Sequence, residues 1–184
     1  MTSPYRPEFE AALRLFARVS EAMVARGLSR PVLVGGAAAE YYSGSALMTG
    51  DFDICTPWGR ALDEELQRAD FVRPTGTGQL SRGWIHPDLR LGLEIVASIP
   101  MDGNVDADHV LLVEDVGDGA SFAIIAVEDL IADRMGQYAS GTASDRLDQA
   151  QILFALHPAV DRDYLDRRIR QETAGEYGVE ALKD

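Results

Sequence analysis

The stretch Pro31–Pro57, PVLVGGAAAEYYSGSALMTGDFDICTP, combines a glycine pair with two closely spaced aspartates. It reads as a short β-branched strand that runs into a glycine pair, a helix over 37–44, and a second strand over 51–56. The second strand carries two aspartates one residue apart in an otherwise apolar run. Because carboxylates resist burial unless something compensates them, and a metal ion is a common compensation, the pattern predicts a cation beside the two acids.

The strand itself sets the geometry of the aspartate pair. Residues two apart on a strand share a face, so Asp51 and Asp53 project together with Cα atoms roughly 6.6–6.8 Å apart. Phe52 and Ile54 then point into the core. Two such carboxylates suit Mg²⁺, or two ions about 3.5–4 Å apart as in two-metal phosphoryl-transfer sites. The alternative is that TGDFD forms a turn with exposed acids.

Two further features favour the metal interpretation. Gly35 and Gly36 let the main chain approach a phosphate closely, and the amides at the following helix N-terminus attract anions, although a glycine pair also suits a tight turn. Glu94 lies in an apolar strand, where a charge is costly unless it is paired or faces a site. Glu94 could instead pair with Arg82 or Arg90.

The rest of the chain divides into a strand-rich part and a helical part. Further strands are expected over 71–75, 81–86, 90–98, 109–114 and 121–126. Further helices are expected over 8–27, 58–70, 127–140, 144–156 and 160–173, and the tail from residue 174 is expected to be loosely held. We therefore predict an α/β (α+β) core over 1–126 and a C-terminal helical segment over 127–184 packed on that core.

Composition narrows the classes of function. The net charge of −13 has the wrong sign for a dedicated DNA-binding protein, whose affinity comes largely from neutralising phosphates. Cys55 is the only cysteine, which excludes an intrachain disulfide, and His86, His109 and His157 lack the spacing of metal ligands. No apolar run is long enough to cross a membrane, and no signal pattern opens the chain, so a cytoplasmic protein is expected.

At these residues the sequence resembles the nucleotidyltransferases of the DNA polymerase beta superfamily. The shared pattern is a hydrophobic residue followed by Gly35-Gly36, the acidic pair Asp51 and Asp53, and a later acid on a neighbouring strand, Glu94. Within the superfamily the chain is most similar to small bacterial abortive-infection-type toxin nucleotidyltransferases and related proteins. The motifs of their helical part match Asp129-Leu130, Arg134, and Asp145 with Asp148. The sequence departs from the group at Leu47, where arginine is frequent.

The resemblance implies a nucleotidyltransferase-like mixed sheet flanked by helices, and a metal-dependent transfer of a nucleoside monophosphate from a nucleoside triphosphate. Asp51, Asp53 and Glu94 would be the catalytic and metal-binding residues, with Mg²⁺ or Mn²⁺ as the cofactor. The implied nucleotide-binding residues are Gly35, Gly36, Ser43, Ser45, Thr49, Arg134 and Asp148. The acceptor is an unknown hydroxyl on a small molecule, a protein or an RNA end, and a toxin–antitoxin protein partner is a further expectation.

Each of the helical matches also has a structural interpretation. Asp145 and Asp148 lie where acids offset a helix dipole, in a helix that Thr142 or Ser144 would cap. Arg134 could form a surface salt bridge with Glu128 or in the neighbourhood of Asp133. Two alternatives to catalysis therefore stay open, namely a catalytically weak or inactive nucleotide-binding protein and an interaction domain whose acids are incidental.

Overall fold

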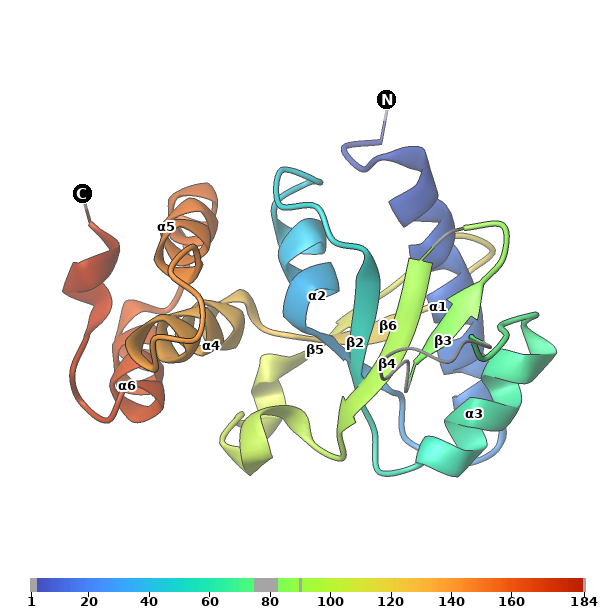
Figure 1. Ribbon diagram of the computed structural model, residues 1–184. Coiled ribbons are helices and arrows are strands. Elements are labelled where there is room, and N and C mark those ends of the chain that lie inside the picture. The colour runs from blue at the N-terminus through green and yellow to red at the C-terminus, as the bar shows by residue number, and fades with distance from the viewer. Residues whose placement is uncertain (1–2, 75–82, 90, 184) are drawn as a thin grey trace. The chain divides into compact units, whose positions relative to one another are not determined.

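The computed structural model describes residues 3–74, 83–89 and 91–183 (Figure 1). The chain forms two compact units, Met1–Ile124 and Ile125–Asp184. The first unit contains the sheet and three helices, and the second contains three helices and a short 3₁₀ turn. The predicted α/β fold with a mixed sheet and C-terminal helices is confirmed.

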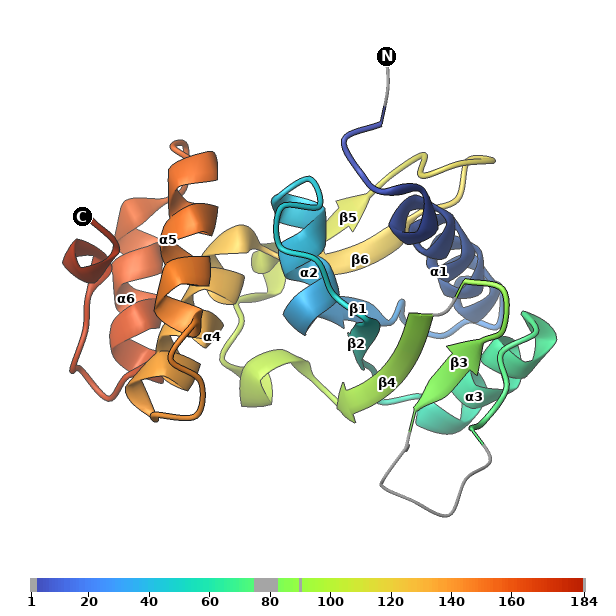
Figure 2. The same ribbon diagram turned by 45° about the horizontal axis from the view of Figure 1, so that its top comes forward.

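The first unit is built on a six-stranded sheet with the strand order β3-β4-β2-β1-β6-β5. β2 runs antiparallel to β1 and parallel to β4, and β1 runs parallel to β6, so the sheet is mixed. The strands are β1 (Val32–Val34), β2 (Asp51–Cys55), β3 (Trp84–His86), β4 (Leu91–Ala97), β5 (Val110–Val113) and β6 (Phe122–Ile125). The helices are α1 (Pro7–Ala25), α2 (Gly35–Tyr42) and α3 (Gly59–Arg68), and the 3₁₀ turns η1 (Pro100–Gly103) and η2 (Ala107–His109) connect β4 to β5. Figure 2 shows the strands from a second direction.

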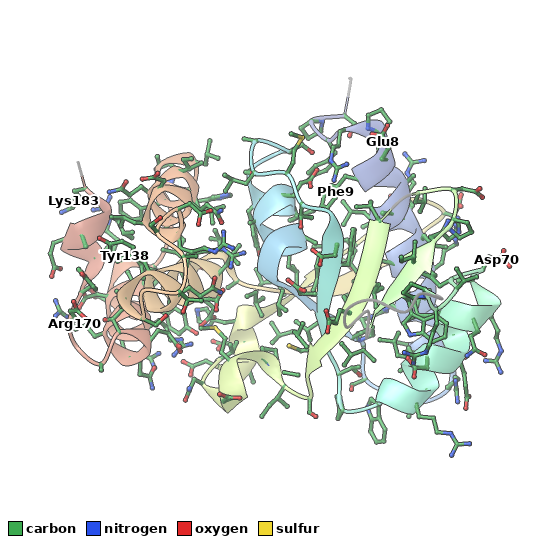
Figure 3. All side chains as sticks on the ribbon, viewed as in Figure 1. Glu8, Phe9, Asp70, Tyr138, Arg170 and Lys183 are labelled. Atoms are coloured by element: carbon green, nitrogen blue, oxygen red, sulfur yellow. The ribbon has the colours of Figure 1, made fainter. Side chains whose placement is uncertain are left out.

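The helices of this unit pack on one face of the sheet. Phe52 on β2 points to this face and contacts the rings of Phe9 and Phe16, both on α1 (Phe9 is labelled in Figure 3). Trp84 on β3 is 3% exposed, and its indole N–H donates to Asp63 on α3 across 2.7 Å. Since successive residues of a strand alternate between faces, the neighbours of Phe52 on β2 point to the opposite face.

The sequence of α1 explains why this helix covers the sheet. Its apolar residues recur at three- and four-residue spacings, and Phe9, Leu13, Phe16 and Met23 are all buried. Gly27 follows the helix with a φ of +76°, a conformation that glycine adopts without strain.

The second unit contains α4 (Val127–Ala139), α5 (Arg146–Leu156), α6 (Arg162–Glu172) and the 3₁₀ turn η3 (Val179–Leu182). A fully buried ion pair ties α4 to α6, because Arg168 Nε lies 2.6 Å from Asp129 Oδ1 and both side chains are 0% exposed. Tyr164 O–H donates to the second carboxylate oxygen of Asp129 across 2.8 Å. Asp129, predicted here only as part of a helical motif, therefore holds two helices together.

Three local expectations were wrong. Residues 71–74 form no strand, because Val72 makes only an isolated bridge with Ile85, and the rest of the predicted turn lies outside the described residues. The tail is held rather than loose, since Asp166 accepts the Val179 N–H across 2.9 Å and Leu182 is 4% exposed. In α5 the N-cap residue is Asp145 rather than Thr142 or Ser144.

In the residues that the structure describes, none of the helices combines the length and the apolar character that crossing a bilayer requires.

Candidate functional site

The structure places Asp51, Asp53 and Glu94 on the same face of two neighbouring strands. In the parallel pairing of β2 with β4, Asp53 lies directly opposite Glu94, and Asp51 lies opposite Gly92. Paired residues point to the same face, and neighbouring strands lie about 4.8 Å apart. This face is opposite the one that carries Phe52 and α1, and all three acids keep contact with solvent. The arrangement offers carboxylate oxygens from two strands to one solvent-accessible region.

The glycine pair lies against this acidic region. The Gly36 N–H donates to Asp53 Oδ2 across 3.3 Å. Gly35 has a φ of +61°, and a β-carbon at this position would stand 2.0 Å from the same carboxylate oxygen. Only a residue without a side chain fits there, which gives the predicted glycine pair a structural cause.

The loop between α2 and β2 is fixed by a buried carboxylate that the sequence analysis did not single out. Glu40 on α2 is 0% exposed and accepts the Thr49 N–H across 2.7 Å. Arg6 donates to both carboxylate oxygens of Glu40, across 2.6 and 3.0 Å, and to the Thr49 carbonyl across 2.6 Å. The hydrogen bonds to Glu40 raise the pKa of Arg6. A glutamate inside an alanine-rich helix of eight residues was the available signal for this network.

Thr49 connects this network to the acidic region. Its hydroxyl donates to the Asp51 carbonyl and to Asp51 Oδ1, each across 3.2 Å. The chain of contacts therefore runs from Arg6 through Glu40 and Thr49 to Asp51. Hydrogen-bonded networks of this kind restrict a loop to one conformation, so the N-terminal segment contributes to the placement of the first aspartate.

The two serines predicted to assist phosphate binding make contacts within the same loop. Ser45 Oγ donates to Glu40 across 2.9 Å and accepts the Arg6 N–H across 3.1 Å. Ser43 Oγ accepts the Leu47 N–H across 2.9 Å. Both hydroxyl groups therefore support the loop in this structure, and their roles in binding phosphate stay predictions.

The predicted residues of the helical part lie in the second unit. Arg134 on α4 donates to Asp133 across 3.1 Å and to Gln137 across 3.4 Å, so the alternative of a salt bridge near Asp133 is present, although Arg134 is 4% exposed rather than on the surface. Asp148 is exposed in the first turn of α5. Arg82 and Arg90, the alternative partners of Glu94, lie outside the described residues, and Arg60 on α3 has a 97% exposed side chain.

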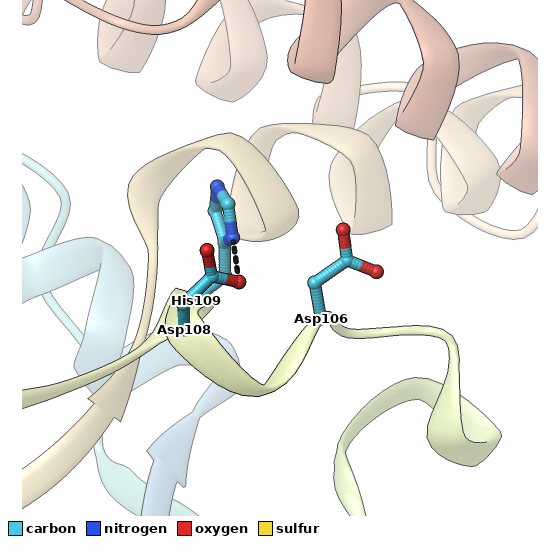
Figure 4. A group of neighbouring side chains, drawn as sticks. All are labelled: Asp106, Asp108 and His109. Atoms are coloured by element: carbon cyan, nitrogen blue, oxygen red, sulfur yellow. Dashed lines mark hydrogen bonds and ion pairs between the residues drawn. The ribbon is translucent and has the colours of Figure 1, made fainter.

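A second group of possible metal ligands comes from a single turn. Asp106, Asp108 and His109 place one ligand atom each within 4.8 Å of the others, and His109 Nδ1 lies 3.0 Å from Asp108 Oδ1 (Figure 4). His109 was expected to lack ligand spacing because the three histidines lie far apart in the sequence, whereas its neighbours here are the carboxylates of Asp106 and Asp108. Within the described residues, the carboxylate oxygens of Asp51, Asp53 and Glu94 do not all lie within 4.8 Å of one another, as the ligand atoms of this group do. A cation at the three acids would therefore require their side chains to turn toward one another.

Comparison with known proteins supports the fold. No family model and no curated protein matches the sequence. Among solved structures, the chain is similar to the crystal structure of an antigenic nucleotidyltransferase-like protein from Paracoccidioides brasiliensis. The likeness has a TM-score of 0.61 and covers 97% of this chain and 93% of the other, with 15% sequence identity. The chain therefore has a nucleotidyltransferase-like fold.

Proposed function

We propose that this chain is a metal-dependent nucleotidyltransferase, which transfers a nucleoside monophosphate from a nucleoside triphosphate to a hydroxyl group and releases pyrophosphate. The fold likeness supports the class of reaction. The sequence pattern of a glycine pair, an acidic pair and a third acid supports the same class independently of the fold.

The observation that carries the proposal is the pairing of Asp53 with Glu94 across two parallel strands. These residues are 41 positions apart in the sequence, and the register places them side by side on the face that also carries Asp51. Three acids gathered on an open face of a sheet repel one another, and nothing in sheet packing requires them. A bound cation would remove this repulsion.

The donor set fits a hard divalent cation. Asp51, Asp53 and Glu94 supply only carboxylate oxygens, which Mg²⁺ prefers and which Mn²⁺ also accepts. When bound, the metal would neutralise the negative charge that develops on the phosphates. We propose that Asp51 and Asp53 hold the metal and that Glu94 contributes to it from the neighbouring strand.

Glu94 also has a proposed role as a proton acceptor. The acceptor oxygen attacks the α-phosphorus in line, and its proton passes to a Glu94 carboxylate oxygen. A new bond forms between the acceptor oxygen and the α-phosphorus, the bond from the α-phosphorus to the bridging oxygen breaks, and that oxygen leaves with pyrophosphate.

The remaining predicted residues are proposed to bind the triphosphate. The main chain at Gly35 and Gly36 approaches an anion without side-chain interference, and the Gly36 N–H already donates to a carboxylate in this structure. The other proposed nucleotide-binding residues are Ser43, Ser45, Thr49, Arg134 and Asp148.

The closer resemblance to abortive-infection-type toxins is a proposal as well. It is supported by the helical matches at Asp129-Leu130, Arg134 and Asp148, and it would imply a protein partner that neutralises the toxin. Expression of the chain in a bacterial host should then slow growth, and Asp53→Asn should restore growth at equal protein level. Equal growth with both proteins would contradict the toxin proposal and leave the transferase proposal standing.

The transferase proposal is tested by Asp53→Asn in an assay with α-labelled triphosphates, Mg²⁺ and a cell extract as the source of acceptor. We expect labelled product and pyrophosphate from the wild-type chain and neither from the variant, with an unfolding free energy within about 1 kcal/mol of wild type. Asp70→Asn, at an exposed position with a φ of +64°, is the control for an acid-to-amide change. Tight triphosphate binding without pyrophosphate release would instead establish the inactive binding protein, and full activity of Asp53→Asn would refute the metal role.

A further inference from the structure

β5, the strand at one edge of the sheet, exposes two leucines. β5 ends the strand order in the described residues, next to β6. Its two central residues, Leu111 and Leu112, point to opposite faces and are 42% and 51% exposed. A terminal strand also presents N–H and C=O groups outward, and exposed apolar edges of this kind pair readily with another chain. Natural sheets usually protect such an edge with charged residues, a bulge or a covering segment, so we expect the edge of β5 to be protected in one of these ways or to bind a partner.

The carboxylates that flank β5 in the sequence have no lysine or arginine among them. From position 91 to position 133 the sequence contains no lysine or arginine. The strand is preceded by Asp106 and Asp108 and followed by Glu114 and Asp115, all of them exposed. The side chain of Asp108 is 84% exposed. One cation from another element approaches the turn after the strand, since a β-carbon on Gly117 would meet Arg14 at 3.3 Å, and Arg14 already pairs with Glu10.

These charges argue against a second copy of the chain as the partner. Antiparallel pairing of β5 with its own copy, centred between Leu111 and Leu112, would place Asp108 opposite Asp115 of the other chain. Parallel pairing would place each acid beside its own counterpart. Like charges that face each other across strands are destabilising in both arrangements.

The same charges favour a cationic partner. We propose that β5 is a docking edge for an extended segment of another protein, which adds as a further strand and carries lysine or arginine at both ends. Main-chain hydrogen bonds to β5 supply affinity, and apolar side chains in the middle of the segment cover Leu111 and Leu112. Four residues of strand span about 13 Å, so the two basic ends lie four to six residues apart. A polyanion such as RNA would be repelled by the same acids.

The probe for the test is a blocked nine-residue peptide with alternating valine and threonine in the middle and two arginines at each end. Binding is measured by calorimetry at low and at physiological salt, and hydrogen exchange of the full chain is followed with and without peptide. We expect binding that weakens with salt, together with protection at 110–113.

Two control peptides separate strand pairing from simple attraction between charges. The first replaces the arginines by glutamates, and the second keeps the arginines but has proline at two central positions, which removes N–H donors and prevents strand addition. Neither control should bind. Equal binding of the proline peptide would overturn the proposal, because it would show attraction to the acidic surface alone.

Charge-neutral variants locate the site. Asp108→Asn, Glu114→Gln and Asp115→Asn together should weaken binding of the basic peptide about tenfold. A matched triple change at exposed acids elsewhere, Glu8→Gln, Asp70→Asn and Glu176→Gln, should leave binding within about twofold of wild type (Glu8 and Asp70 are labelled in Figure 3). Absence of binding at millimolar peptide, equal loss in both triple variants, or dimerisation of the free chain through β5 would each refute the docking edge.

Discussion

Gly35 lies so close to Asp53 that a β-carbon on the glycine would stand 2.0 Å from Asp53 Oδ2 and 2.9 Å from its Cβ. The second distance shows that rotation of the carboxylate alone would not relieve the contact. The glycine and the aspartate are therefore coupled, and a side chain at position 35 must displace the strand residue that we propose to hold the metal.

Gly35→Ala should abolish nucleotide transfer and destabilise the fold. The φ of +61° costs an alanine about 1–2 kcal/mol, and the contact with Asp53 adds to this cost. Gly27→Ala is the matched control, because Gly27 has a φ of +76° and a β-carbon there meets nothing within 4 Å. The control should lose similar backbone stability but keep full transfer activity. Activity of Gly35→Ala equal to that of Gly27→Ala would show that the contact with Asp53 is unimportant.

Glu40→Gln should lower both stability and transfer rate. The amide keeps the size of the side chain but turns a donor toward Arg6 or Thr49, so a buried hydrogen-bond donor loses its acceptor at a cost of about 1–3 kcal/mol. Because Thr49 contacts Asp51, we expect kcat to fall more than the affinity for the triphosphate. Chemical denaturation and steady-state kinetics measure the two effects.

The control for Glu40→Gln is Glu64→Gln, at a partly exposed ion pair with Arg26. Exposed pairs contribute about 0–1 kcal/mol, so this variant should behave as wild type. If Glu40→Gln loses stability while its kcat stays unchanged, Glu40 has only a structural role, and the predicted effect on transfer is wrong.

Asp129→Asn should destabilise the helical unit strongly. The substitution removes one of two carboxylates that pair with the fully buried Arg168, whose other partner is Glu172 at 2.9 Å. Breaking a buried pair by removing one partner costs about 3–5 kcal/mol. Asp145→Asn removes a pair with Arg146 in which Asp145 is 61% exposed, and it should cost at most about 1 kcal/mol. Hydrogen exchange in α4 and α6 reports on the unit directly, and equal exchange in both variants would contradict the structural role of Asp129.

Tyr5 should make the fold sensitive to alkali. Burial, followed by the neighbouring Tyr41, raises the pKa of Tyr5 to about 12 from an ordinary value of about 10. A pKa that is higher in the folded chain contributes stability that is fully present below pH 10 and is lost as the pH rises toward 12. Tyr5→Phe should therefore flatten the fall of the unfolding free energy between about pH 10 and 12. An unchanged slope would show that Tyr5 is not the group responsible.

The order of elements could be predicted because the information is local. Apolar residues at helical spacing in α1, the alternation of Asp51, Phe52 and Asp53 in β2, and the glycines that end segments are all properties of short stretches. The prediction of a strand at 71–75 was wrong because a strand also needs a pairing partner, which is not a local property. Only Val72 pairs, in a single bridge with Ile85.

The relationships that define the candidate site needed the tertiary structure. The sequence alone determined that Asp51 and Asp53 share a face, because that follows from the twofold period of a single strand. Only the fold decided that Glu94 stands beside Asp53, that Arg6 reaches Glu40, and that Asp129 is buried against Arg168. Strand order, register and burial arise from pairing between segments 34 to 41 residues apart, and such pairing depends on the packing of the whole unit.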